Sequence, residues 1–171
     1  MLRLAKAFWD IALWRRTPAQ LPASSFLLTL VCIAAALLEV VSAFLPPVSS
    51  EHIVTRIVLS VAVPLGFAWA VLAVAHRRQR FLQTATALLG VGVLVEIALY
   101  PIGSLIHIIG SEQLAAVPLG VLMLTGFIWY LLACANIWRA ALDSGLSLGA
   151  VVSVGYILLS IVLEQQWLPD T

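Results

Sequence analysis

Charged residues are scarce in this chain of 171 residues. Only 10% of them are Asp, Glu, Lys or Arg, whereas 63% are hydrophobic. A soluble globular domain has about a quarter charged residues and about half apolar ones. No long polar stretch separates the apolar runs, so the chain leaves no room for a separate soluble domain. These absences predict an integral membrane protein.

Cysteine is also scarce, and recognisable catalytic motifs are missing. Cys32 and Cys134 lie inside apolar runs without metal-type spacing, so we expect small core residues rather than a disulfide framework or a zinc site. The sequence contains no HExxH, no GxSxG, no Walker loop and no paired intramembrane aspartates. We therefore expect no enzyme: no catalytic residue, no metal ion and no cofactor. Nucleic-acid partners are not expected either.

The clearest apolar run, residues 82–109, carries an acid near its middle, Glu96. About 20 apolar residues at 1.5 Å per residue cross a hydrocarbon core of about 30 Å. A central acid costs about 3 kcal/mol on insertion, whereas each Leu, Ile, Val or Phe returns about 0.3–0.6 kcal/mol. The aliphatic residues around Glu96 offset that cost. The segment is therefore predicted to insert, with Glu96 facing other helices rather than lipid.

Four further runs have the same character, so the predicted fold class is all-α, a five-helix bundle in the membrane. The membrane domain covers residues 24–171, and its spans are predicted at residues 25–45, 54–75, 82–109, 114–138 and 146–167. Short loops containing proline, glycine or arginine separate them.

Residues 1–23 are predicted to form an amphipathic helix and a linker. Such a helix would lie flat in the headgroup region, with Phe8, Trp9 and Trp14 dipping into the membrane. The alternative is a lead-in helix packed on the bundle. In either case the apolar face of the helix contains Leu4, Phe8 and Ile11, and the polar face contains Arg3, Lys6 and Asp10.

Positive charge is placed unevenly along the predicted spans. Five spans put the two termini on opposite sides, and eight of the nine Lys and Arg residues fall on the amino-terminal side. Only Arg56 falls on the other. Because basic loops stay in the cytoplasm, we expect a bacterial inner-membrane protein with a cytoplasmic amino terminus and a carboxyl terminus outside. The eight residues are Arg3, Lys6, Arg15, Arg16, Arg77, Arg78, Arg80 and Arg139.

Three intramembrane acids, Glu39, Glu96 and Glu164, are predicted at similar depth, in the outer half of the membrane. With Tyr100 and Arg56 they form a candidate polar site. Such a site could bind a cation, a proton or a lipid headgroup. The alternative is structural: Glu39 pairs with Arg56, or each acid is hydrogen-bonded to a neighbouring helix, and the contact only fixes helix register.

A second candidate site is the basic cluster of Arg77, Arg78 and Arg80, in the loop between the second and third spans. It could attract anionic lipid, at about 1 kcal/mol per cation. The alternative is that the cluster only determines topology.

The order of the segments resembles the Yip family of Rab-interacting, five-pass membrane proteins. A cytoplasmic amino terminus, five closely spaced spans and minimal loops match that plan, and residues 136–163 are similar to the family's final hairpin. The family tracts DLYGP and YGYS are absent, and only Gly155 and Tyr156 are similar to the second. The segment FWDIALWRRTPAQLPAS also resembles the start of small bacterial membrane proteins of unknown function. The resemblance implies an adaptor rather than a reaction.

The sequence therefore predicts a multi-pass membrane adaptor or scaffold. Its expected partners are membrane lipid and other membrane proteins, or further copies of itself. The alternative is a small transporter or channel component with a carboxylate site at Glu39 and Glu96.

Overall fold

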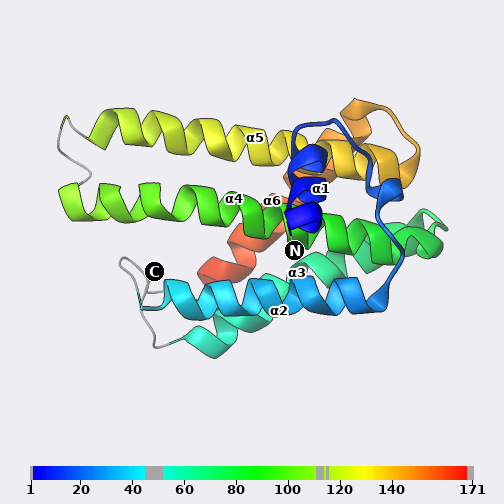
Figure 1. The fold of residues 1–171 in the computed structure, drawn as a ribbon, viewed down its shortest axis with the longest axis horizontal. Helices are drawn as coiled ribbons and strands as arrows, with labels where there is room; N and C mark the ends of the chain where they lie inside the picture. The colour runs from blue at the N-terminus through cyan, green and yellow to red at the C-terminus, as the bar shows by residue number, and fades with distance from the viewer. Residues whose placement is uncertain (1, 45–51, 111–113, 115, 169–171) are drawn as a thin grey trace.

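The computed structural model describes residues 2–44, 52–110, 114 and 116–168, without the side chains of residues 2–5. In these ranges the chain forms α-helices and two short 3-10 helices, and it contains no strand (Figure 1). The elements are α1 (Leu2–Ala12), η1 (Pro18–Gln20), α2 (Ser25–Ser42), α3 (Ile53–Val74), η2 (Arg78–Arg80), α4 (Phe81–Ile109), α5 (Ala116–Leu142) and α6 (Leu146–Trp167).

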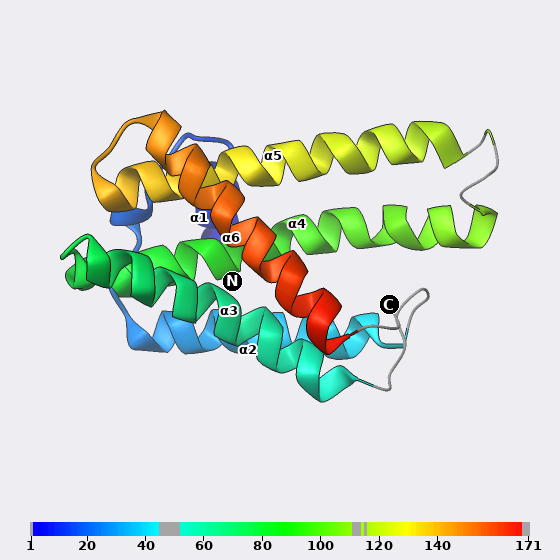
Figure 2. The same cartoon turned by 180° about the vertical axis from the view of Figure 1, so that it is seen from behind.

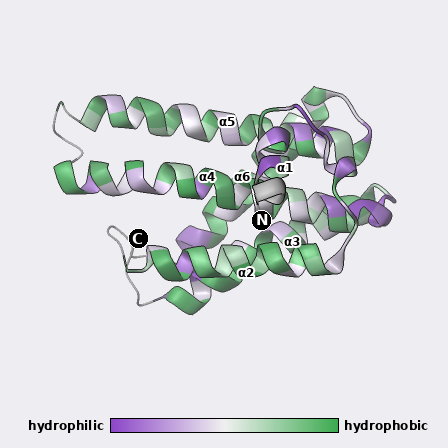
Figure 3. Ribbon diagram, in the orientation of Figure 1, coloured by the Kyte–Doolittle hydropathy of each residue, from purple (hydrophilic) through white to green (hydrophobic). Residues whose placement is uncertain are grey.

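Helices α2 to α6 are each long and apolar enough to cross a membrane. Their positions agree with the five predicted spans to within a few residues. Figure 3 shows apolar residues along most of the length of these helices. The arrangement suggests a multi-pass membrane protein and confirms the all-helical fold class.

Helix α5 extends four residues beyond Trp138, the approximate predicted end of the fourth span. Helix α5 continues for one more turn, through Ala140, Ala141 and Leu142. These residues favour helix, and Ala141 is buried. The helix ends where Asp143 adopts a φ of 49° and the Ser144 amide donates to the Arg139 carbonyl at 3.1 Å. A residue in the left-handed conformation after the last turn is a common way to end an α-helix.

The two ends of the bundle differ in charge. At one end, here called the basic end, α3 and α5 terminate and Arg77, Arg80 and Arg139 gather. At the other, the distal end, α2 terminates, α3 begins and α6 terminates. Helices α4 and α5, with 29 and 27 residues, are longer than the 18, 22 and 22 residues of α2, α3 and α6. Their hairpin therefore overhangs the rest of the bundle at the distal end (Figure 1).

Helix α6 ties the two hairpins together. Seen from behind, it runs diagonally from the basic end of α5 to the distal end of α3 (Figure 2). Gly149 permits this crossing, because a Cβ there would collide with the backbone oxygen of Ala135 and with Arg139 on α5. Next to it, Ser153 is fully buried. Small residues at such a crossing let two helix backbones approach closely.

Helix α1 packs on α4 and α5. The Phe8 ring lies against Gly90, and the Trp129 indole donates to the Ala12 carbonyl at 3.0 Å. Trp9 packs edge-on against Trp129, with ring centroids 5.5 Å apart. These contacts pack α1 on the bundle, as the alternative above expects, and a cytoplasmic position for it stays a prediction. Phe8 is buried in protein, whereas Trp9 and Trp14 are exposed. A position at the membrane interface remains a prediction.

Candidate functional site

All five residues of the predicted polar site line one cavity of about 530 Å³ in the distal half of the bundle. They come from four helices: Glu39 from α2, Arg56 from α3, Glu96 and Tyr100 from α4, and Glu164 from α6. Side chains at distant positions in the sequence are thus gathered by the packing of these helices.

The overhang of α4 explains why these residues meet. Glu39, Arg56 and Glu164 each lie one turn from a distal helix end, whereas Glu96 lies in the middle of α4. Because α4 extends past α2 and α3, an inner stretch of α4, rather than its end, lies beside their distal parts (Figure 1). Tyr100, one turn further along α4, shares the face of Glu96.

Glu39 and Arg56 form an ion pair across the α2–α3 hairpin. The Arg56 Nε donates to a Glu39 carboxylate oxygen at 3.2 Å. Glu39 is buried, and the Arg56 side chain is 21% exposed. The pairing considered for these two residues from the sequence is therefore present. It compensates most of the charge that Glu39 brings into the interior.

Tyr100 connects α4 to the end of α2. Its hydroxyl donates to the backbone carbonyl of Ser42 at 2.8 Å. Ser42 is the last residue of α2, and such terminal carbonyls have no partner within their own helix. The Ser42 hydroxyl in turn donates to the Glu39 carbonyl at 2.9 Å. Tyr100 therefore holds one wall of the cavity in place.

Glu96 differs from Glu39 in its bonding. It is half-buried, and within the described part of the chain it forms no hydrogen bond and no ion pair. Burying a carboxylate without a partner is costly unless a proton or a cation neutralises it. Glu96, like the more exposed Glu164, is thus a group of this cavity that could exchange a ligand.

Glu164 is exposed at the rim of the cavity, as expected from its place near the end of α6. A smaller adjoining cavity of about 30 Å³ is lined by Glu39, Arg56, Ser60 and Glu164, among others. Three carboxylates and one guanidinium therefore border the two cavities, which leaves a net charge of −2 when all of them are ionised.

The cavity has an aromatic wall that the sequence did not assign to the site. Met123, Phe127 and Tyr130 reach it from α5, and Tyr156 reaches it from α6. Tyr156 lies two turns before Glu164 on one face of α6, so helical spacing could have placed it there. The α5 residues carried no such signal, because nothing in the sequence shows which face of α5 turns inward.

The basic cluster at the other end is held by one acid. Arg77 and Arg80 both donate to the same Asp143 carboxylate oxygen, Arg80 at 2.8 Å, and these two hydrogen bonds lower the pKa of Asp143 to about 2. Arg80 also donates to the Ala140 carbonyl at 2.8 Å, near the end of α5. Arg78 stacks over the exposed Trp69 ring at 5.6 Å. Two of the three arginines therefore join α5 to the α3–α4 loop.

Comparisons with protein-family models, with curated proteins and with solved structures found no match to this chain.

Proposed function

We propose that this chain is a multi-pass membrane protein whose distal cavity binds a small cation or a proton, and that it acts as a small transporter or channel component. The five apolar helices support a membrane location. The placement of eight of the nine basic residues supports a cytoplasmic basic end, in an inner membrane of bacterial type, with the cavity toward the outside.

The observation that carries this proposal is the contrast between Glu39 and Glu96 within one cavity. Glu39 has Arg56 as its partner, whereas Glu96 has none among the described residues. A carboxylate kept solely to fix helix register would be expected to bond to a neighbouring helix, as Glu39 does. An acid without a protein partner at this depth is better explained by a ligand that comes and goes.

The lining of the cavity favours a cation over an anion. The acids outnumber the single arginine, and Phe127, Tyr130 and Tyr156 offer ring faces that attract cations. A volume of about 530 Å³ is large enough for a hydrated metal cation or a small organic amine.

Infrared difference spectroscopy on the purified protein tests the proposal. Sodium, potassium and tetramethylammonium are added in turn, and the pH is stepped between 4 and 10. We expect one of these changes to shift a carboxyl band of the wild type, and Glu96→Gln to remove that shift. Asp10→Asn, which alters a buried acid outside the cavity, should keep it.

A Glu96 band that responds to no cation and to no pH step would contradict the proposal. If the wild type responds, uptake of the same cation or of protons into proteoliposomes is measured next. Glu96→Gln should abolish this transport while the protein stays folded and inserted.

The second candidate function is the membrane adaptor. One observation favours it: the overhanging part of the α4–α5 hairpin exposes apolar side chains, with Ile108, Leu114 and Val117 at 69%, 90% and 60% exposure. A partner protein or a second copy of the chain could cover them. An adaptor should tolerate Glu96→Gln and lose its partner when these residues become polar, which is the opposite of the transporter's response.

A further inference from the structure

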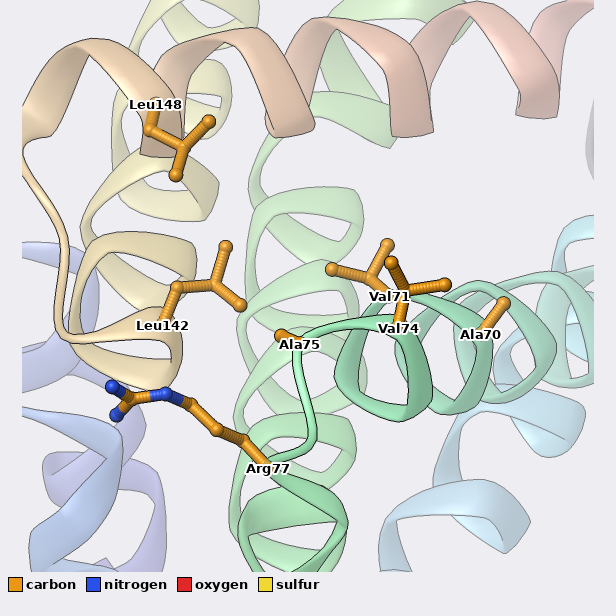
Figure 4. Close-up of a pocket in the computed structure, with 7 residues that line it drawn as sticks. All are labelled: Ala70, Val71, Val74, Ala75, Arg77, Leu142 and Leu148. Carbon is orange, nitrogen blue, oxygen red and sulfur yellow. The ribbon is translucent and has the colours of Figure 1, made fainter.

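A second cavity, of about 540 Å³, opens between α3 and α6 at the basic end (Figure 4). Its lining is apolar apart from Arg77. Val71 and Val74 project from α3, while Leu142 and Leu148 project from α5 and α6 on the opposite side. The cavity is thus a gap between two helices that do not meet at their ends.

The position of this gap matches the boundary of a membrane. It is formed by the last turns of α3 and the first turn of α6. Trp69, which precedes the lining residue Ala70 in the chain, is 55% exposed, and exposed tryptophan is typical of the interface between headgroups and hydrocarbon. An occupant would therefore have its apolar part along α3 and α6 and its polar part beyond their ends.

The charge at the rim of this cavity determines which polar group its occupant would carry. Arg77 lines the cavity, and its guanidinium points toward the turn between α5 and α6 (Figure 4). Arg77 and Arg80 share a single carboxylate, that of Asp143, and Arg78 forms no ion pair within the described residues. Three arginines and one carboxylate leave a net charge of +2 next to an apolar gap.

We propose that an anionic phospholipid binds here, with an acyl chain between α3 and α6 and its phosphate beside Arg77. Acyl chains match the apolar lining, and an arginine with N–H groups left over suits a phosphate. The site lies at the opposite end of the bundle from the acidic cavity and does not depend on the function proposed for that cavity.

Native mass spectrometry of the protein in neutral detergent tests this proposal. Phosphatidylglycerol and phosphatidylcholine are offered at equal concentration, and glycerol 3-phosphate serves as a probe of the headgroup alone. We expect one phosphatidylglycerol to be retained at least tenfold more strongly than phosphatidylcholine. Glycerol 3-phosphate should not be retained, because it lacks the acyl chain.

Two variants test the two halves of the site. Arg77→Gln should weaken lipid retention about fivefold, which corresponds to the binding energy that one cation contributes at a membrane surface. Asp143 keeps Arg80 as its partner in this variant. Val74→Trp should fill the gap and weaken retention at least tenfold. Val74 is 82% exposed, so the larger side chain does not disturb the core.

Each variant has a matched control. Arg15→Gln removes an exposed charge from the amino-terminal segment, away from the cavity. Val54→Trp places the same ring at a position of α3 that is 71% exposed at the distal end. Both should retain lipid as the wild type does, as should Glu96→Gln.

Equal retention of the two lipids would overturn the proposal. So would an equal loss in Arg15→Gln and Arg77→Gln, because binding would then follow overall charge. Normal retention by Val74→Trp would show that the gap holds no acyl chain.

Discussion

The two halves of this bundle treat charge in opposite ways. In the basic half the core is closed by small and apolar residues, such as Ala85, Ala133 and Trp138, and apart from the buried Asp10 of α1 the charged groups lie at its edge. In the distal half Glu39 is buried and Glu96 is half-buried, and both line a cavity. At the basic end Arg77, Arg80 and Asp143 join the ends of helices, whereas Glu39 and Glu96 in the distal half occupy positions that apolar residues could have filled.

Under the proposed function, the difference separates charges that stabilise the fold from charges that bind a ligand. Replacing a buried ionic group by an apolar one of similar size is often neutral or stabilising. Acids retained inside the distal half therefore suggest a use other than stability. The basic half should respond to packing changes, and the distal half to changes of ligand.

The largest effect is expected at the α5–α6 crossing of the basic half. Gly149→Ala places a methyl group against the Ala135 carbonyl and Arg139, which cannot rotate away because they include backbone atoms. We expect a loss of about 2–3 kcal/mol in the free energy of unfolding, measured by denaturant titration in mixed micelles. Gly155→Ala, on the same helix with open space around it, should be neutral or stabilising by up to about 1 kcal/mol. Equal behaviour of the two variants would disprove the tight crossing.

Breaking the Glu39–Arg56 ion pair of the distal half should come next. Glu39→Gln leaves Arg56 without an ionised partner in a half-buried position. Because Arg56 retains some contact with solvent, we expect about 1–2 kcal/mol rather than the 3–5 kcal/mol of a fully buried pair. A double-mutant cycle with Arg56→Gln isolates the coupling. If the coupling is zero, the pair does not hold α2 and α3 in register.

A smaller effect is expected from the exposed ion pairs of Asp143 with Arg77 and Arg80 at the basic end. The folded protein holds the pKa of Asp143 at about 2, below its ordinary value of 3.8. The stabilisation from this carboxylate is therefore complete above about pH 4 and is lost as the pH falls through 2. Asp143→Asn should lower the melting temperature slightly at neutral pH, and the gap from the wild type should close between pH 4 and pH 2. A gap that stays constant over this range would contradict the pairing.

The smallest effect on stability is expected at Glu96. Because Glu96 forms no hydrogen bond or ion pair in the described structure, Glu96→Gln should change the free energy of unfolding by less than about 0.5 kcal/mol. The same denaturant titration measures it. A loss as large as that of Glu39→Gln would make Glu96 a structural residue and remove the distinction between the two acids.

The sequence predicted the helices well because apolar length is a local property. It also placed the five residues of the candidate polar site at similar depth, because distance from a helix end gives depth and helical spacing gives the face; these five line the distal cavity, and their role as a binding site stays a prediction. Glu96 and Tyr100 illustrate both.

The remaining features depend on contacts that no local pattern contains. The docking of Phe8 on Gly90 joins segments far apart in the chain. The cavity-facing side of α5, with Met123 and Phe127, depends on how α5 packs on α4, where Met123 lies against Gly103. The continuation of α5 to Leu142 was missed because Arg139 and Asp143 resemble loop residues, although both belong to the closure of that helix end.

The unequal helix lengths have a mechanical consequence for the surrounding bilayer. With 29 residues at 1.5 Å each, α4 is about 44 Å long, against about 27 Å for α2 with 18 residues. A hydrocarbon layer of about 30 Å suits the second length and not the first. In a bilayer, the membrane beside the α4–α5 hairpin would thicken or the hairpin would tilt, whereas the membrane beside α2 would be nearly undistorted. Two protruding hairpins that met along this edge would relieve such a one-sided mismatch.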